Sequence, residues 1–434
     1  MAAAAPEPSP LSYTRRRAAA LAAALGNALE WFDFAVYGYF ATALGKAFFP
    51  ESDAALQTVA AFGVFAIGYL MRPIGSLVLG PIGDLLGRRK MLTLSILLMG
   101  GSSLLIGLLP TYAAIGAIAG YALLALRMLQ GFSLGGEYTG SMAYTTEAAP
   151  PDRQGLLSSL ATAGAILGFI LGSLSAALLS ALLGNAALEE WGWRLPFLAG
   201  ALVAVAGWWL RLHMPETLQL SEDHFLFVQN GTRRIATAIG MQLRHVARQW
   251  RLLIRVAALI SFSNVVFYVL FVYLVDYVGH QGDGRMRDAN TITTVVQALG
   301  LPVIVAGGWL ADKIGRVTLT RLVALGLGVV AIPCILAAQT GGPLGLAIGQ
   351  GVAMVPIMLS FGSQGVLIAR LVRPEERCAV FSISYSLAIA LFAGTGPLVA
   401  SWLLEGLRWT WGPALYCMLY AAPALLALRG LRQD

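Results

Sequence analysis

Twelve long apolar stretches dominate this chain, and they constrain its fold more than any other feature. Each is near the roughly 20 residues that a helix needs to cross a bilayer. Only 12% of the residues are charged, against about 25% in ordinary soluble domains. The sequence therefore predicts an all-α membrane protein with twelve transmembrane helices. The stretches lie at about 18–44, 54–80, 91–109, 112–139, 156–183, 195–213, 251–279, 290–311, 319–338, 343–369, 378–404 and 410–429.

The basic residues predict how these helices are oriented, because Lys and Arg accumulate in cytoplasmic loops. With a cytoplasmic N-terminus, 22 of the 29 Lys and Arg residues fall on the cytoplasmic side and 5 on the other, while Arg72 and Arg127 fall inside helices. Both termini are therefore expected to be cytoplasmic in a multi-pass protein of a bacterial inner membrane. The same bias accounts for the net charge of +7 through topology and contact with anionic lipid, so nucleic-acid binding is not expected.

The longest polar break divides the chain into two halves of six helices. The predicted parts are a tail at 1–17, a six-helix bundle at 18–213, a cytoplasmic loop at 214–250, a second bundle at 251–429 and a tail at 430–434. GPIGDLLGRRK (80–90) in the first half matches GWLADKIGRVT (308–318) in the second at four positions. Duplicated bundles around a central loop are typical of a transporter, in which two halves rock about a site between them.

The repeated loops predict gates that close the cytoplasmic side. Their glycines permit close helix approach, and each Asp can pair with a base or lie at a neighbouring helix N-terminus. A static brace between helices is the alternative. The expected gating residues are Gly80, Asp84, Gly87, Arg88, Arg89, Glu147, Arg153, Asp312, Lys313, Gly315, Arg316 and Arg377.

Arg127 is the residue that the sequence favours for substrate binding. It lies about 25 Å along its helix from the outer end, too deep to reach water. A buried guanidinium there is expected to bind an anion, and its fork of donors suits a carboxylate. A permanent ion pair is the alternative. Gln130 shares its face, whereas Gly131 and Gly135 are expected to permit close helix packing.

Two carboxylates in the first apolar stretch predict a proton-coupling site. GNALEWFDFAVYG (26–38) places Glu30, Asp33 and Tyr37 on one helix face, and Arg72 lies at a similar depth on the next helix. One carboxylate can neutralise Arg72, since buried charges persist when they are paired. A second one without a base tends to bind a proton. The sequence does not decide which does which; Tyr37 is expected to contact substrate.

Other polar residues in the apolar stretches are weaker predictions. Glu137 is a secondary candidate for proton coupling. Substrate contacts are further expected from Asn264, Tyr268, Gln350 and Tyr385, although such residues often only hydrogen-bond between helices. The four histidines are scattered without ligand spacing, and no metal or cofactor site is expected. No GxxxxGK[ST] or HExxH motif occurs, so an enzyme is not expected.

The loop GPIGDLLGRRK resembles the signature of the major facilitator superfamily. Further stretches resemble one branch, the metabolite:proton symporter family: GNALEWFDFAVYG, YLMRPIG (69–75), RMLQGFSLGGEYTGS (127–141), EEWGWRLPF (189–197) and SYSLAIALFAGTGP (384–397). This resemblance implies a twelve-helix transporter of small solutes that carries protons. The N-terminal stretch is similar to proline/betaine members, whereas EEWGWRLPF with Arg127 is similar to 2-oxoglutarate members and, more broadly, to citrate members.

The combined prediction is a proton-coupled importer of a small organic acid, such as a di- or tricarboxylate, that works as a monomer. The main alternative is a proline/betaine importer, for which no long C-terminal extension with a sensing role is expected after Asp434. A non-transporting receptor on the same fold is a remote alternative.

Overall fold

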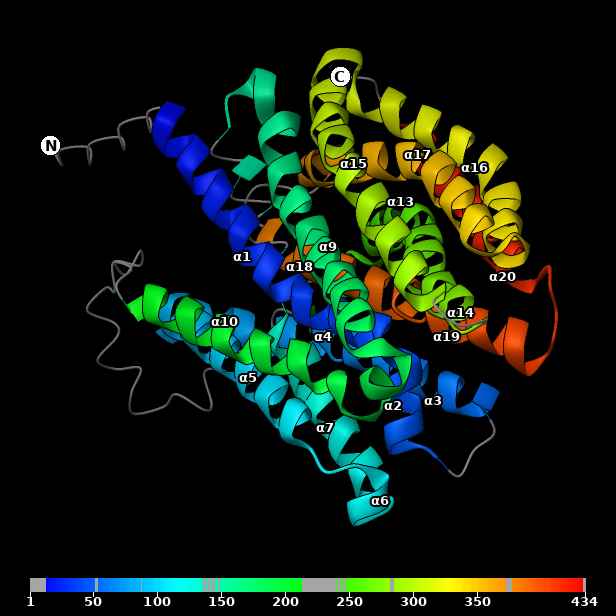
Figure 1. The fold of residues 1–434 in the computed structure, drawn as a ribbon. Helices are drawn as coiled ribbons and strands as arrows, with labels where there is room; N and C mark the ends of the chain where they lie inside the picture. Colours follow the sequence, from blue (N-terminus) through cyan, green and yellow to red (C-terminus); the bar gives the residue numbers. More distant parts are fainter. Residues whose placement is uncertain are drawn as a thin grey trace, which may run out of the picture.

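The computed structural model describes residues 13–50, 54–86, 88–135, 138, 142, 145–146, 149–212, 240, 243–244, 247–281, 285–371 and 377–431. All regular structure within these ranges is helical (Figure 1). Seven helical segments of the described chain are long and apolar enough to cross a membrane. Each of the twelve predicted stretches contains helix, but the count of twelve spans and the cytoplasmic placement of both termini stay predictions.

The N-terminal half contains the elements up to residue 212. They are α1 (Tyr13–Tyr39), α2 (Ala41–Phe48), α3 (Ala54–Leu70), α4 (Arg72–Leu86), α5 (Arg88–Leu108), α6 (Tyr112–Ile115), α7 (Ile118–Ser133), η1 (Pro151–Arg153), α9 (Gln154–Ala187), η2 (Leu188–Gly192) and α10 (Arg194–Leu212). The predicted stretch 112–139 is interrupted at Gly116, whose φ of 62° ends α6. The predicted stretch 54–80 is divided between α3 and α4, directly before Pro73.

The C-terminal half contains the elements from residue 250; the predicted repeat of two six-helix bundles stays a prediction. Its elements are α13 (Trp250–Tyr268), η3 (Val269–Tyr273), α14 (Leu274–Gly279), α15 (Arg285–Ile314), α16 (Arg316–Thr340), α17 (Gly342–Leu371), α18 (Arg377–Ala388), η5 (Ile389–Ala393), α19 (Gly396–Ser401), η6 (Trp402–Gly406), α20 (Gly412–Met418) and α21 (Ala421–Ala427). The π-helical segments η3 and η5 interrupt the predicted stretches 251–279 and 378–404.

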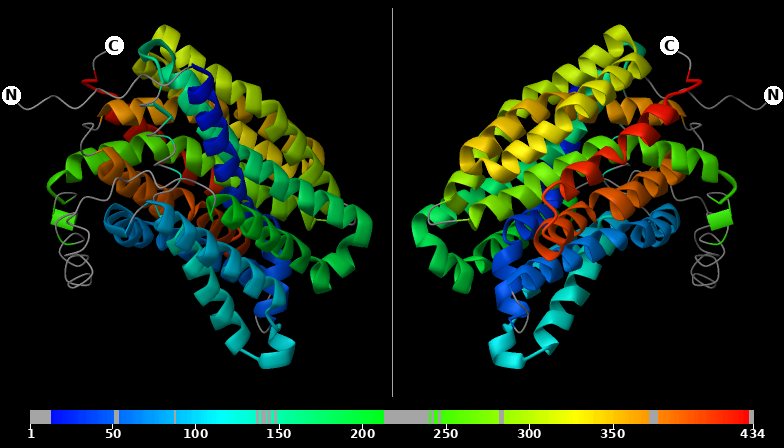
Figure 2. Two further views of the ribbon diagram at one scale, coloured as in Figure 1. Left: turned by 90° about the vertical axis from the view of Figure 1, so that its left-hand side faces the viewer. Right: turned by 90° about the vertical axis from the view of Figure 1, so that its right-hand side faces the viewer.

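The two halves pack together along α9. This helix lies between α1 of its own half and α15 of the other half (Figures 1 and 2). On the α1 side, a Cβ atom at Gly164 would collide with the Ala24 carbonyl oxygen. On the α15 side, Gly155 and Gly308 face each other so closely that a Cβ on either would meet the other's carbonyl oxygen. Small residues thus set how closely the halves approach, as is usual where helices pack within a membrane.

Large apolar side chains cover much of the outer surface of both halves. Leu182, Leu202, Val329 and Leu344 are among the most exposed. Such a surface would be a liability in water. In a bilayer it faces lipid tails, which agrees with the apolar character of the spanning helices.

In the N-terminal half, α7 and the residues that follow it approach α3 and α4 in a similar way. A Cβ atom at Gly131 of α7 would collide with the carbonyl oxygen of Gly68 of α3, and one at Gly135, just after α7, with the backbone of Gly75 and Ser76 of α4. Gly131 and Gly135 thus permit close packing, as expected from the sequence. They fix the positions of the buried polar residues on α7.

We predict that Gly131→Ala lowers the melting temperature of the detergent-solubilised protein or prevents its folding. The added methyl group has no room, and overpacking of this kind costs about 1–3 kcal/mol. The matched control is Gly101→Ala, because a Cβ at this exposed helical position meets nothing within 4 Å. Equal melting temperatures for the two variants, measured by intrinsic fluorescence, would contradict the packing described here.

Candidate functional site

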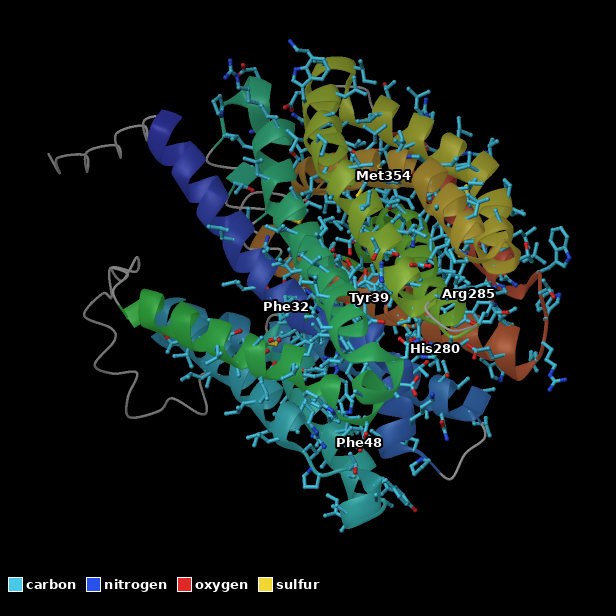
Figure 3. The ribbon with its side chains drawn as sticks, viewed as in Figure 1. Phe32, Tyr39, Phe48, His280, Arg285 and Met354 are labelled. Atoms are coloured by element: carbon cyan, nitrogen blue, oxygen red, sulfur yellow. The ribbon has the colours of Figure 1, made fainter. Side chains whose placement is uncertain are left out.

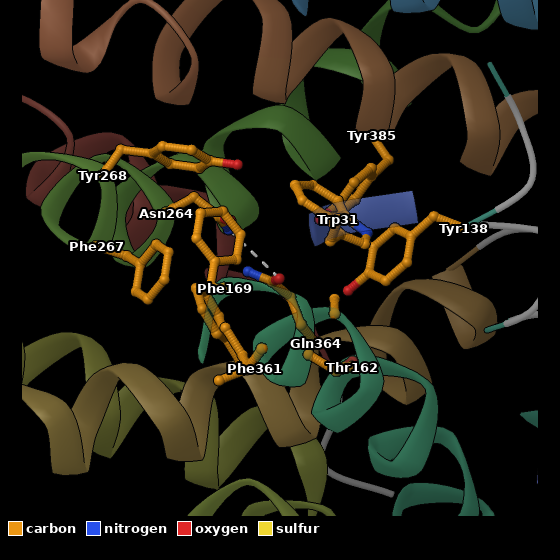
Figure 4. Close-up of a pocket in the computed structure, with 12 residues that line it drawn as sticks. Trp31, Tyr138, Thr162, Phe169, Asn264, Phe267, Tyr268, Phe361, Gln364 and Tyr385 are labelled. Carbon is orange, nitrogen blue, oxygen red and sulfur yellow. Dashed lines mark hydrogen bonds between the residues drawn. The ribbon is translucent and has the colours of Figure 1, made fainter. Parts of the chain in front are cut away.

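A cavity lies between the two halves. The N-terminal half contributes Trp31 from α1, Tyr138, and residues of α9, while α13, α17 and α18 supply the other wall (Figure 4). The lining residues are Trp31, Tyr138, Thr162, Ala165, Ile166, Phe169, Asn264, Phe267, Tyr268, Phe361, Gln364 and Tyr385. None of them is charged. Ligand pockets commonly have this character, mostly apolar walls with a few polar groups.

Aromatic rings form most of the cavity wall and join the two halves. The ring centroids of Tyr138 and Tyr385 are 5.1 Å apart, and those of Phe169 and Phe267 are also 5.1 Å apart. Both pairs cross from the N-terminal to the C-terminal half. Figure 4 also shows a polar contact in the wall, in which the Asn264 amide donates to Oε1 of Gln364 over 3.5 Å.

A buried arginine lies beside this aromatic wall. The guanidinium carbon of Arg72 is 4.8 Å from the centroid of the Trp31 ring and 5.8 Å from that of Tyr69. Arg72 is 1% exposed, yet its Nε and Nη1 atoms have no hydrogen-bond partner among the described residues. A buried charge without hydrogen bonds is costly. The faces of the Trp31 and Tyr69 rings stabilise this guanidinium through cation–π contacts.

A second buried arginine belongs to a polar chain within the N-terminal half. Arg127 donates from Nη1 to Oε1 of Gln130 over 2.7 Å, and Gln130 donates to the Ser103 hydroxyl over 2.8 Å. Ser103 also interacts with the carboxylate of Asp33. Asp33 and Arg127 are thus linked through two neutral side chains, and no salt bridge shorter than 4 Å joins them in the described part of the chain.

Rings also surround the guanidinium of Arg127. Its carbon atom is 4.4 Å from the centroid of Phe34 and 4.2 Å from that of Tyr37. Phe34 in turn packs on Tyr69, whose hydroxyl is hydrogen-bonded to that of Tyr268 over 2.8 Å. Because Tyr268 lines the cavity, this path connects the Arg127 cluster with the cavity and with the C-terminal half.

The residues predicted to bind substrate fall into three places. Asn264, Tyr268 and Tyr385 line the cavity. Arg127, Gln130 and Tyr37 gather in the neighbouring polar cluster. Gln350 lies apart, where it donates to the Leu270 carbonyl and to Thr293.

The predicted proton-coupling residues are divided in the same way. Asp33 belongs to the Arg127 cluster, whereas Arg72 lies beside the cavity against Trp31. Glu30 and Arg72 both act electrostatically on the hydroxyl of Tyr138. Glu137 lies outside the described residues. These roles stay predictions.

Sequence reasoning missed several cavity residues that the structure brings together. Trp31, Phe169, Phe267, Phe361 and Gln364 were not singled out. Aromatic residues in apolar helices follow the same pattern as ordinary core residues. The only available signal was the position of Trp31 between Glu30 and Asp33.

One predicted gating residue makes a contact between the halves. Oδ1 of Asp312 accepts from the backbone N–H of Gly155 over 2.8 Å, and Oδ2 accepts from that of Leu156 over 2.9 Å. Asp312 of α15 thus caps the first turn of α9 in the other half, where the helix dipole favours a carboxylate. The gating role of this contact stays a prediction.

The other predicted gating residues are less informative. Arg153 is exposed beside Asp152, and Gly315 precedes α16 with a φ of 89°. Arg316 is buried in the first turn of α16, and Lys313 lies in the last turn of α15. Gly87 and Glu147 lie outside the described residues, as do the side chains of Asp84, Arg88, Arg89 and Arg377 and the surroundings of Gly80.

A charged network joins the halves near the opposite end of α15, and sequence reasoning missed it. We call it the His280 network; Figure 3 labels His280 and, at the start of α15, Arg285. Thr42 donates to Asp276 over 2.6 Å, and Lys46 bonds Glu189 over 2.6 Å. His280 approaches Glu189 to 3.6 Å and Asp276 to 3.7 Å. Its members are Thr42, Lys46, Glu189, Asp276 and His280, so the halves contact each other on both sides of the cavity.

The His280 network makes stability depend on pH. Burial disfavours the imidazolium, but the carboxylates of Asp276 and Glu189 outweigh burial and raise the pKa of His280 above its ordinary value. The other charged groups close by are Lys46 on Glu189 and Glu405, which interacts electrostatically with His280. Because the folded state holds this proton more tightly than the unfolded chain, the stabilisation is complete below about pH 6.5 and is lost as pH rises through the folded-state pKa.

We therefore predict that His280→Gln flattens the pH dependence of the melting temperature. The difference in melting temperature between the wild type and the variant should be largest near pH 6 and should shrink toward pH 9, as follows from an ordinary histidine pKa of about 6.5. A difference that does not change with pH would show that His280 carries no proton-linked stability.

Comparison with known proteins identifies the relatives of this chain. A family model described as Major Facilitator Superfamily matches residues 23–366. The glycine betaine/proline/ectoine/pipecolic acid transporter OusA of Dickeya dadantii is 34% identical over 415 residues, which are 95% of this chain and 82% of that protein. The proline/betaine transporter of Escherichia coli K12 is 35% identical over 423 residues, 94% and 82% of the two chains. The ectoine/proline transporter ProP of Corynebacterium glutamicum is 33% identical over 93% of this chain and 81% of its own.

Solved structures share the fold. The xylose transporter XylE from E. coli in a partially occluded inward open conformation has a TM-score of 0.74 at 18% identity and covers 97% of this chain and 99% of its own. The proton:xylose symporter XylE bound to 6-bromo-6-deoxy-D-glucose has a TM-score of 0.72 at 19% identity, with 96% and 95% covered. The relatives and neighbours are transporters, so the expectation that the chain is not an enzyme is confirmed.

The prediction of an organic-acid importer is wrong. Relatives that cover more than nine-tenths of the chain are named for proline, betaine and ectoine, and these names agree with the alternative. The resemblance to 2-oxoglutarate and citrate symporters is not supported either. The physical reason lies in the cavity: no basic residue lines it, and Arg72 lies beside it against Trp31. One guanidinium can pair with one carboxylate, so the further carboxylates of such an acid would lack partners.

Proposed function

The chain belongs to the major facilitator superfamily, and from that premise we propose that it imports a proline- or betaine-like zwitterion together with protons. The single observation that carries the proposal is the aromatic cavity between the halves. It is lined from both halves and flanked by contacts between them on either side. A solute held there can be released to one side at a time, as alternating access requires.

The Asp312 contact and the His280 network are the gates in this proposal. Opening toward the outside separates Thr42 from Asp276 and Glu189 from His280, whereas opening toward the cytoplasm removes Asp312 from the α9 N-terminus. The two sets lie near opposite ends of α15, since Arg285 begins this helix and Asp312 is near its end. One rocking motion of the halves therefore tightens one set while it separates the other.

Proton coupling is assigned to Asp33. Its carboxylate is 3% exposed, and Oδ1 has no hydrogen-bond partner in the described part of the chain. A carboxylate in such surroundings is costly when charged, and a proton removes that cost. The chain through Ser103 and Gln130 to Arg127 supports the link to transport, because Arg127 reaches the cavity residue Tyr268 through Phe34 and Tyr69.

The remaining parts of the proposal concern the oligomeric state, the membrane and the partners. The protein acts as a monomer in a bacterial inner membrane, with both termini cytoplasmic. It requires a solute, protons and the bilayer, and it requires no cofactor.

Uptake by purified protein in liposomes tests the proposal. With an acidic outside and a neutral inside, labelled proline or glycine betaine should accumulate above its outside concentration, and a protonophore should abolish this accumulation. Citrate serves as the negative control. Uptake that merely equilibrates would contradict proton coupling, and binding without any uptake would favour a receptor.

We predict that Asp33→Asn abolishes gradient-driven accumulation but leaves exchange of labelled for unlabelled solute. The amide mimics the protonated carboxyl, so the transporter can still change conformation with substrate bound. Glu30→Gln is the matched control and should retain accumulation. If Glu30→Gln abolishes accumulation while Asp33→Asn retains it, Glu30 carries the proton; the melting temperature of each variant checks that it is folded.

A further inference from the structure

We infer that the central cavity is a split site for a zwitterion, in which the aromatic rings hold the ammonium group and the carboxylate is oriented toward Arg72. This inference rests on the proposed function and specifies how its substrate is recognised. It predicts which arrangement of charged groups a ligand needs in order to bind, in addition to which solutes are transported.

The rings are the part of the site that suits a cation. Seven of the twelve lining residues are aromatic, and no acidic side chain lines the cavity. An ammonium group inside therefore meets ring faces and dipoles, and no carboxylate in the wall itself. The negative face of an aromatic ring attracts cations, and aromatic cages are a common means of binding quaternary ammonium groups.

The rings come from both halves, which connects recognition with conformation. Trp31, Tyr138 and Phe169 belong to the N-terminal half, while Phe267, Tyr268, Phe361 and Tyr385 belong to the C-terminal half. Figure 4 shows the two groups facing the same space. A bound ammonium group therefore contacts both halves only when they are together, so it stabilises the closed arrangement.

The cavity wall also differs from an ordinary apolar core in its polar groups. The amide pair Asn264 and Gln364 faces this space, and an apolar core has no need for buried amides.

Arg72 supplies the opposite half of the recognition. Its guanidinium lies against Trp31 at 4.8 Å and acts electrostatically on the hydroxyls of Tyr138 and Tyr385, two further lining residues. Its Nε and Nη1 atoms have no hydrogen-bond partner among the described residues. Within a low-dielectric interior such a charge attracts a carboxylate strongly, and its free donors suit one.

The two elements together exclude ligands with a single kind of charge. A plain cation gains the rings but is repelled by Arg72 and, further away, by Arg127. A plain anion can pair with Arg72, but the rings stabilise its apolar end only by burying it, without a cation–π attraction. A second carboxylate would meet the negative ring faces. Only a zwitterion satisfies both elements.

Two analogues of glycine betaine separate these contributions. 3,3-Dimethylbutanoate replaces the nitrogen by carbon and keeps shape and carboxylate, but lacks the positive charge. Choline keeps the trimethylammonium group but has a hydroxyl in place of the carboxylate. Competition against labelled glycine betaine on the purified full-length protein measures all three affinities. We expect each analogue to bind the wild type at least about tenfold more weakly than glycine betaine.

Variants then assign each preference to its element. Phe169→Leu with Phe267→Leu should reduce the preference for glycine betaine over 3,3-dimethylbutanoate to about threefold or less, and leave the preference over choline. Arg72→Gln should reduce the preference for glycine betaine over choline and leave the preference over 3,3-dimethylbutanoate. Phe48→Leu is the matched control, because Phe48 is a buried ring that packs on Trp193 outside the cavity; it should change neither preference.

The outcomes distinguish this inference from the proposed function. If the wild type binds neither proline nor glycine betaine, the proposed function fails. If it binds glycine betaine but binds an analogue equally well, or if the variants keep both preferences, the split site is wrong and the function stands. Should Arg72→Gln fail to fold, Arg72→Lys keeps the charge, and the split site then requires that choline remain disfavoured.

Discussion

The cost of burying two arginines in an apolar helical bundle is the constraint on which the rest of this structure depends. Arg72 and Arg127 are at most 1% exposed, and no salt bridge to Asp33 neutralises either in the described part of the chain. Ring faces stabilise both guanidinium groups instead: Trp31 and Tyr69 for Arg72, and Phe34 and Tyr37 for Arg127. Such an arrangement leaves Nε and Nη1 of Arg72 without hydrogen-bond partners among the described residues, beside an aromatic cavity where a substrate carboxylate can meet them.

The same cavity explains how binding is coupled to movement. Its walls come from both halves, and the halves also meet through Asp312 at one end of α15 and through His280 near the other. Helix α9 lies between α1 and α15 at glycine contacts that tolerate no side chain. Two halves that meet at such tightly packed contacts change between discrete packings more readily than they deform.

The fold could be predicted from the sequence much further than the site. Hydropathy locates segments that are helical in the structure, because a bilayer demands long apolar helices and leaves few alternatives. Arg127, Gln130 and Asp33 were likewise recognisable, since buried polar residues are costly and rare there. The aromatic cage was not predictable: Phe169 and Phe267 have the same local pattern as core residues, and only tertiary packing brings them together. The organic-acid prediction failed for a related reason, because a buried arginine indicates a carboxylate but does not distinguish a di- or tricarboxylate from the carboxylate of a zwitterion.

A structure of the protein with glycine betaine bound, determined by electron cryomicroscopy, tests the central claim most directly. The account predicts density between Trp31, Phe169 and Phe267, with the trimethylammonium group against ring faces and the carboxylate on the side of Arg72. Density beside Arg127 with an empty aromatic cavity would contradict it, as would a ligand in the cavity with its carboxylate directed away from Arg72.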